Sequence, residues 1–204
     1  MLAVRANYRN NPYHNFRHGV DVLQSFYYLL ITSTVFDHLK HIEVMGLAVA
    51  SLCHDLAHPG LNNFYQVNAR TPLALLYNNK AVLENFHATA TFCILMRPEF
   101  NFLHSFGQAE FKTFRDIVIS SIMSTDMAVH FDFLNDMKRR YQEDNSFSLE
   151  VKDDVRMMAT SLVKCSDISN VVRSPPILLF IIFLTFFHFF FSFSFFLSND
   201  TFFS

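Results

Sequence analysis

The fold is decided by one stretch, His54-Asp55-Leu56-Ala57-His58-Pro59-Gly60-Leu61-Asn62-Asn63, which follows a run of mostly apolar residues. Proline and glycine break the apolar pattern, so this stretch is expected to end a buried helix. Residues four apart share one helical face, which would direct His54 and His58 into the same space, with Asp55 approaching from the side. Buried imidazoles and carboxylates need partners. The pattern therefore indicates either a divalent metal or histidines satisfied by ordinary core or surface contacts.

Two further polar clusters favour the metal interpretation. His14 and His18 are again four apart, and they follow Pro12, which suits a helix start. Asp167 comes late in the chain, after an apolar-periodic run over residues 155–163. The resulting order is two histidines, then a His-Asp pair, then an aspartate, with long helical intervals between them. This order is typical of the HD-type metal phosphohydrolases.

Five ordered motifs make the resemblance more specific. Residues 54–65 resemble the signature of the class I 3′,5′-cyclic nucleotide phosphodiesterases. Four other segments resemble further motifs of that family in the same order: residues 13–18, 82–85, 124–127 and 165–170. The resemblance covers roughly residues 8–173. It implies an all-α, multi-helix catalytic domain of the HD type, here incomplete, and the lack of cleanly alternating stretches also argues against strands.

The resemblance also implies a two-metal site. The tighter metal, usually zinc, is expected on four ligands: His18, His54, Asp55 and Asp167. Asp55 would bridge to a second ion, magnesium or manganese, whose other ligands are mostly waters. Three residues would orient those waters without binding the metals: His58, Glu84 and Thr125. Two such ions clamp the phosphate oxygens and acidify the attacking water.

A proton donor and substrate contacts are implied as well. His14 would protonate the O3′ leaving group, a role suited to an imidazole near pH 7. The substrate is expected to contact His14, Asp55 and Asp167. The reaction would be hydrolysis of cAMP, cGMP or both to the 5′-monophosphate in signal transduction. Asn63 is expected to be structural and to tie down the loop after the metal motif.

Length and composition limit the alternatives. The 204 residues, 51 % of them hydrophobic, suffice for the core of one domain. A formal net charge of −2 without a basic arm gives no reason to expect nucleic acid. Three cysteines without CxxC spacing favour a reducing compartment, and hence the cytoplasm. Helices are expected at residues 19–33, 39–53, 73–77, 81–96, 108–123, 127–141 and 153–168.

The two ends of the chain differ from this middle part. Residues 1–12 are expected to be short, polar and turn-rich, with an N-terminal helical part of the family's domain missing. Residues 177–197 are nearly pure Phe, Leu and Ile, long enough to span a bilayer. Basic residues before this run would keep a catalytic part, residues 1–173, in the cytoplasm and anchored to the membrane. The other interpretation of residues 174–204 is translated non-coding sequence.

This C-terminal part also bears on activity. In the family, a glutamine and an aromatic clamp after the last metal aspartate hold the purine, and no glutamine follows Arg173 here. An alternative function is therefore a catalytically incompetent fragment that binds metal or partner subunits, including a second copy in a homodimer. A third possible function is that of an HD phosphohydrolase with another substrate. The extended motif after His58 argues against this function. The choice between cAMP and cGMP stays open.

Overall fold

The computed structural model describes residues 1–144 and 148–169, and every regular element within them is a helix. The α-helices are α1 (Leu2–Asn7), α2 (Phe16–Ile31), α3 (His41–Cys53), α4 (Asn63–Asn68), α5 (Pro72–Leu76), α6 (Val82–Leu95), α7 (Gln108–Ser124), α8 (His130–Asp144) and α9 (Lys152–Ile168). Two 3-10 helices, η1 (Thr34–His38) and η2 (Met127–Val129), lie between them. The expected all-α class is confirmed.

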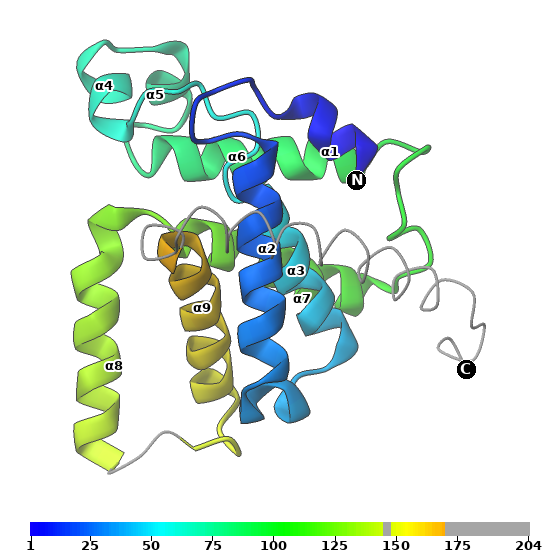
Figure 1. The fold of residues 1–204 in the computed structure, drawn as a ribbon, viewed down its shortest axis with the longest axis vertical. Coiled ribbons are helices and arrows are strands. Elements are labelled where there is room, and N and C mark those ends of the chain that lie inside the picture. The colour runs from blue at the N-terminus through cyan, green and yellow to red at the C-terminus, as the bar shows by residue number, and fades with distance from the viewer. Residues whose placement is uncertain (145–147, 170–204) are drawn as a thin grey trace.

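Helix α3 is the element around which the others pack (Figure 1). It contacts α2, α6, α7 and α9, and α2 in turn lies beside α9. Three buried residues of α3 belong to three different hydrophobic clusters: Leu47, Ala50 and Leu52. The first cluster joins α3 to α1, α2 and α6, the second to α2 and α9, and the third to α6 and α7. A helix this apolar is stable because it is buried on most sides.

The close contact between α3 and α7 depends on a glycine. A Cβ atom at Gly46 would lie 3.0 Å from Ile117 Cγ2 and 3.5 Å from the carbonyl oxygen of Phe114. The missing side chain therefore lets the two helices approach closely. Through this contact α7 is held against the helix that directly precedes the His54-Asp55 pair.

Three expectations about local structure are corrected. Residues 1–12 are not only turns, because α1 forms and buries Val4 and Tyr8 in the first core cluster. Helix α3 ends at Cys53, before the His-Asp pair, and α2 begins at Phe16, after His14. The segment expected as one helix from residue 127 is split into η2 and α8. The remaining expected helices are confirmed to within a few residues at their ends.

In the part of the chain that the structure describes, no single helix is both long and apolar enough to cross a membrane. Residues Gln108–Ser124 and Met127–Gln142 meet the length and composition criteria only together, with a bend of 81° between them. The membrane segment expected at residues 177–197 and the boundary expected after residue 173 lie outside the described residues.

The third cluster gives a stability prediction. Phe114 is fully buried and makes edge-on contacts with three other phenylalanine rings. Phe114→Ala is expected to lower the free energy of unfolding by about 3–5 kcal/mol, because it leaves a cavity. The matched control is Phe131→Ala, whose ring is 74 % exposed, and it should change stability by no more than about 0.5 kcal/mol. Urea unfolding followed by circular dichroism measures both values, and equal losses would contradict the packing described.

Candidate metal centre

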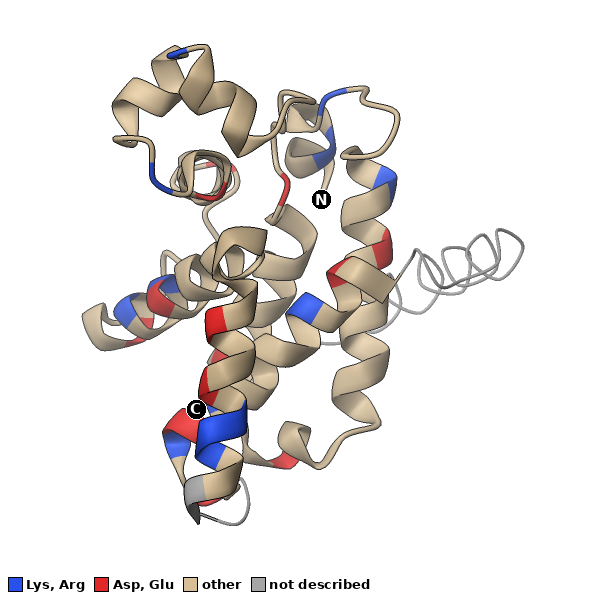
Figure 2. Cartoon of the chain, turned by 90° about the vertical axis from the view of Figure 1, so that its left-hand side faces the viewer, with Lys and Arg blue, Asp and Glu red and all other residues tan. Residues whose placement is uncertain are grey.

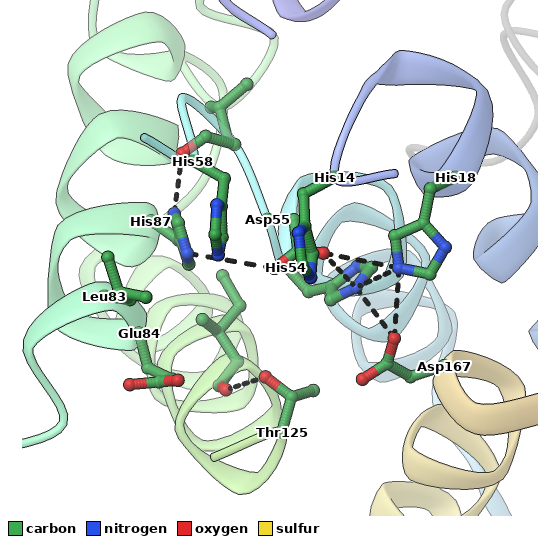
Figure 3. A network of polar contacts seen from close by, with 12 residues as sticks. His14, His18, His54, Asp55, His58, Leu83, Glu84, His87, Thr125 and Asp167 are labelled. Carbon is green, nitrogen blue, oxygen red and sulfur yellow. Dashed lines mark hydrogen bonds and ion pairs between the residues drawn. The ribbon is translucent and has the colours of Figure 1, made fainter. Parts of the chain in front are cut away.

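Four side chains from three helix ends meet in one buried site (Figure 3). His18 lies in the first turn of α2, His54 and Asp55 directly follow α3, and Asp167 lies in the last turn of α9. The start of α2 is fixed by Asn15, whose side-chain oxygen accepts hydrogen bonds from the backbone N–H groups of residues 17 and 18. Such a cap sets where the helix begins and hence the direction of His18.

The distances in this cluster suit a metal ion. His18 Nε2 and His54 Nε2 are 3.1 Å apart, and each is 3.1 Å from Asp167 Oδ1. Asp55 Oδ2 lies 3.3 Å from the first nitrogen and 3.2 Å from the second. Ligand atoms about 2.0–2.1 Å from a tetrahedral zinc ion are about 3.3 Å from one another. The four expected ligands therefore already have the spacing that such an ion requires.

The hydrogen bonding of His54 leaves a lone pair for the metal. His54 Nδ1 lies 2.9 Å from the carbonyl oxygen of Ser51, to which it donates. In the neutral ring that binds a metal, the other nitrogen, Nε2, therefore carries the lone pair and faces the cluster. A backbone carbonyl commonly fixes a metal-binding histidine in this way. Imidazole nitrogens and carboxylate oxygens are natural ligands of a divalent cation, so the cluster has the chemistry of a metal site.

The pKa shifts of the cluster also support a metal site. Burial opposes a charged His54, but the carboxylates of Asp55 and Asp167 outweigh it and raise the imidazole pKa well above its usual value. The pKa of His18 is raised for the same reasons. Burial would raise the pKa of Asp55, yet the neighbouring imidazoles hold it well below its usual range. The site therefore stabilises positive charge at its centre.

Three other histidines form a row beside this cluster. The His14 and His58 rings are stacked with centroids 4.0 Å apart and an 11° angle between planes, and His58 stacks on His87 at 5.4 Å and 20°. Donor atoms of His14, Asp55 and His58 lie within 4.8 Å of one another. Near-parallel rings keep their lone pairs in parallel planes, however, so both cannot point at one ion about 2.1 Å away. Hydrogen bonding is the better use of this row.

The helical-face argument for the two histidine pairs is wrong, although the residues do converge. His14 lies before α2 and His58 lies after α3, so neither pair shares a helix. The chain turns sharply at Ala57, which has φ 62°. That turn brings His58 beside His14 instead of stacking it below His54. The site is thus built from the ends of helices.

His58 presents an N–H group to the site. The backbone N–H of Gly60 donates to His58 Nδ1 at 2.9 Å, so this nitrogen carries no proton. Burial lowers the pKa of His58 to about 4, which makes the ring neutral near pH 7. Its single proton is therefore on Nε2. A neutral donor of this kind can form a hydrogen bond with a water molecule.

His87 is a site residue that the sequence analysis did not identify. It lies on α6, one turn after Glu84, and its Nδ1 donates to the carbonyl oxygen of Leu56 at 2.7 Å. Its other nitrogen, an acceptor, is 3.8 Å from Asp55 Oδ1. Burial lowers its pKa to about 4. The shared face with Glu84 was the available signal, but nothing in the sequence connects α6 to Asp55.

Glu84 and Thr125 lie near the cluster without joining it (Figure 3). Glu84 accepts a 2.9 Å hydrogen bond from the side chain of Asn63, which also accepts one from the backbone N–H of Leu83. Asn63 thus ties the loop after the metal motif to α6, as expected. Thr125 ends α7 and donates to the carbonyl oxygen of Ile122 at 2.7 Å.

The comparison with known proteins agrees with this geometry. A sequence profile described as 3′5′-cyclic nucleotide phosphodiesterase matches residues 13–189. The chain therefore belongs to the 3′,5′-cyclic nucleotide phosphodiesterase family. The match continues past Arg173, where the resemblance in the sequence analysis ended.

Relatives and solved structures define how much of the family this chain contains. It is 41 % identical to the 3′,5′-cyclic-nucleotide phosphodiesterase regA of Dictyostelium discoideum, over 85 % of this chain and 22 % of that protein. The high affinity cGMP-specific 3′,5′-cyclic phosphodiesterase 9A of Mus musculus is 40 % identical, over 85 % and 32 %. The phosphodiesterase domain of Salpingoeca rosetta rhodopsin phosphodiesterase superposes with a TM-score of 0.80 at 35 % identity, covering 85 % of this chain and 53 % of that one. The chain thus spans about half of that solved domain and a third or less of these two relatives.

The metal centre makes a direct prediction. Asp167→Ala removes one of four ligands and leaves a neighbouring carboxylate and two imidazoles, so zinc affinity should fall by more than about 100-fold. The matched control is Asp153→Ala, an exposed aspartate in the first turn of the same helix, which should leave affinity unchanged. Competition with a chromophoric chelator measures both constants. Wild-type affinity in Asp167→Ala would remove this residue from the ligand set.

Proposed function

We propose that this chain supplies the metal centre and the proton donor of an enzyme that hydrolyses cAMP, cGMP or both to the 5′-monophosphate. The observation that carries the proposal is the convergence of two imidazole nitrogens and two carboxylate oxygens at 3.1–3.3 Å. Membership of the cyclic nucleotide phosphodiesterase family supports the substrate class.

The donor set favours particular metals. Two imidazole nitrogens and two carboxylates favour zinc at the four-ligand position. The free oxygen of Asp55 would bind magnesium or manganese, which keep several waters. Two such ions would neutralise phosphate charge and lower the pKa of the attacking water. His58, Glu84 and Thr125 would hold the waters around the second position, and His87 joins them as an acceptor.

His14 is the proposed proton donor. It is half-buried, and burial lowers its pKa below the usual 6.5. An anionic phosphate nearby would favour its protonated form again. In the reaction the water oxygen bonds to phosphorus, the P–O3′ bond breaks, and O3′ takes the proton of His14, which the proton lost by the water replaces. The substrate would contact His14 and, through the metals, Asp55 and Asp167.

Two substitutions separate the proposed roles. Asp55→Ala should abolish both metal binding and turnover of cAMP and cGMP, because this carboxylate serves both metal positions. His14→Ala should keep the metal and lower kcat by about 10²–10⁴-fold, the usual contribution of a general acid. His104→Ala, at an exposed histidine, is the matched control and should change neither property. Metal content is measured by mass spectrometry and turnover by nucleotide chromatography, and loss of metal in His14→Ala would contradict its role.

A second candidate function rests on exposed apolar side chains. Phe64, Leu75 and Phe131 are 75 %, 67 % and 74 % exposed. These exposed side chains favour a protein that holds metal and associates with a partner subunit or a second copy. An unmutated chain that binds zinc but turns over neither cAMP nor cGMP would favour this candidate over the enzyme.

The remaining partners and the location complete the proposal. We place the protein in the cytoplasm, supported by three free cysteines among the described residues, with membrane contact through residues 177–197. On the side drawn in Figure 2, the helices carry both Lys or Arg and Asp or Glu residues. This mixed charge, with the net charge of −2, gives no reason to propose a nucleic-acid partner.

A further inference from the structure

One asparagine side chain connects the two backbone segments that carry the stacked histidines. Asn11 Nδ2 donates to the carbonyl oxygen of His14 at 3.0 Å and to that of His58 at 2.8 Å. These carbonyls belong to residues 44 positions apart in the chain. A side-chain amide has two N–H groups, so this one is fully used. The hydrogen bonds therefore join the backbone of the two residues whose rings stack at 4.0 Å.

The surroundings of Asn11 hold its amide in this orientation. Its own backbone carbonyl accepts a 2.9 Å hydrogen bond from the side chain of Asn15, the residue that caps α2. On the other side lies Gly60, with φ 85°, where a Cβ atom would come within 3.1 Å of Asn11 Oδ1. The same Gly60 donates its N–H to His58 Nδ1. Asn11 therefore lies between the start of α2 and the turn that orients the His58 ring.

We infer that Asn11 is a positioning residue for proton transfer, an inference that rests on the proposed function. It holds the His14 ring against His58 so that the proton of His14 reaches the departing O3′ oxygen. Without the two hydrogen bonds, the segment before α2 and the loop after α3 would shift relative to each other. A displacement of about 1 Å at a reacting group can cost about 10²-fold in rate. The metal ligands belong to other hydrogen bonds and would stay in place.

The sharpest variant is Asn11→Asp, which keeps the size and removes both donors. The carboxylate oxygen that replaces Nδ2 faces both carbonyl oxygens and is repelled by them. Asn10→Asp makes the same charge change one residue away, at an exposed position, and is the matched control. Asn11→Ser, a smaller neutral change, serves as a second variant that removes the amide without introducing charge.

Two substrates distinguish positioning from general damage. Each variant of the full chain is assayed with zinc and magnesium on cAMP and cGMP, and on bis(p-nitrophenyl) phosphate, whose p-nitrophenolate leaves without a proton. Asn11→Asp and Asn11→Ser should lower kcat on the cyclic nucleotide about 10- to 100-fold, with KM and zinc content unchanged. Hydrolysis of bis(p-nitrophenyl) phosphate should stay near wild type. An equal fall on all substrates, or loss of zinc, would mean a merely structural role and overturn the inference.

A measurement without turnover tests the same contact. Ring stacking shifts the Cε1–H resonances of His14 and His58 in a ¹³C–¹H spectrum. These two signals should move in Asn11→Asp and Asn11→Ser, whereas the signal of exposed His104 should not, and Asn10→Asp should move none of them. Unmoved His14 and His58 signals would overturn the inference. If the unmutated chain hydrolyses no cyclic nucleotide, the proposed function fails, and these spectra still decide whether Asn11 holds the two rings together.

Discussion

The structure depends on the close approach of two imidazoles and two carboxylates in one largely buried site. Two imidazole nitrogens and two carboxylate oxygens lie about one hydrogen-bond length apart, 3.1–3.3 Å, in a region that is largely withdrawn from solvent. Buried charges of this kind are costly unless they are paired. The two carboxylates raise the pKa of both imidazoles, so protonated rings can compensate their charge. A divalent cation that binds the neutral rings compensates it as well. The packing of α2, α3 and α9 around one centre is the geometric condition for this arrangement.

Helix ends are the parts of this fold that carry its chemistry. A residue at a helix end has a backbone free to turn, and its side chain can leave the direction set by the helix. Asn15 caps the start of α2, shortly before His18. Ala57 adopts a positive φ, which turns the chain between His54 and His58. The interior of each helix instead supplies the apolar contacts that hold its end in place. In each of these helices the interior therefore contributes to stability, and the end carries the residues of the site.

The histidines of the site differ in what they offer, and backbone groups decide the difference. Ser51 fixes His54 so that a lone pair faces the metal cluster, and Leu56 does the same for His87. The backbone N–H of Gly60 instead donates to His58 Nδ1, so that the proton of His58 is on Nε2. Since burial keeps His58 and His87 neutral, each has one donor and one acceptor nitrogen. Waters or phosphate oxygens around the site therefore meet groups of defined polarity.

The helices and the metal ligands could be predicted from the sequence, because both depend on local patterns or on the order of motifs along the chain. The apolar periodicity predicts helices. The resemblance to the phosphodiesterase family implies the ligand set His18, His54, Asp55 and Asp167, whose ligand atoms the structure brings within 4.8 Å of one another. The sequence did not predict three other contacts: the stacking of the His14 ring on His58, the position of His87 beside Asp55, and the hydrogen bonds of the Asn11 amide. These contacts depend on how helix ends from distant segments meet. Only the packed tertiary structure decides that, because a ring's partner and its tautomer are set by backbone groups remote in sequence.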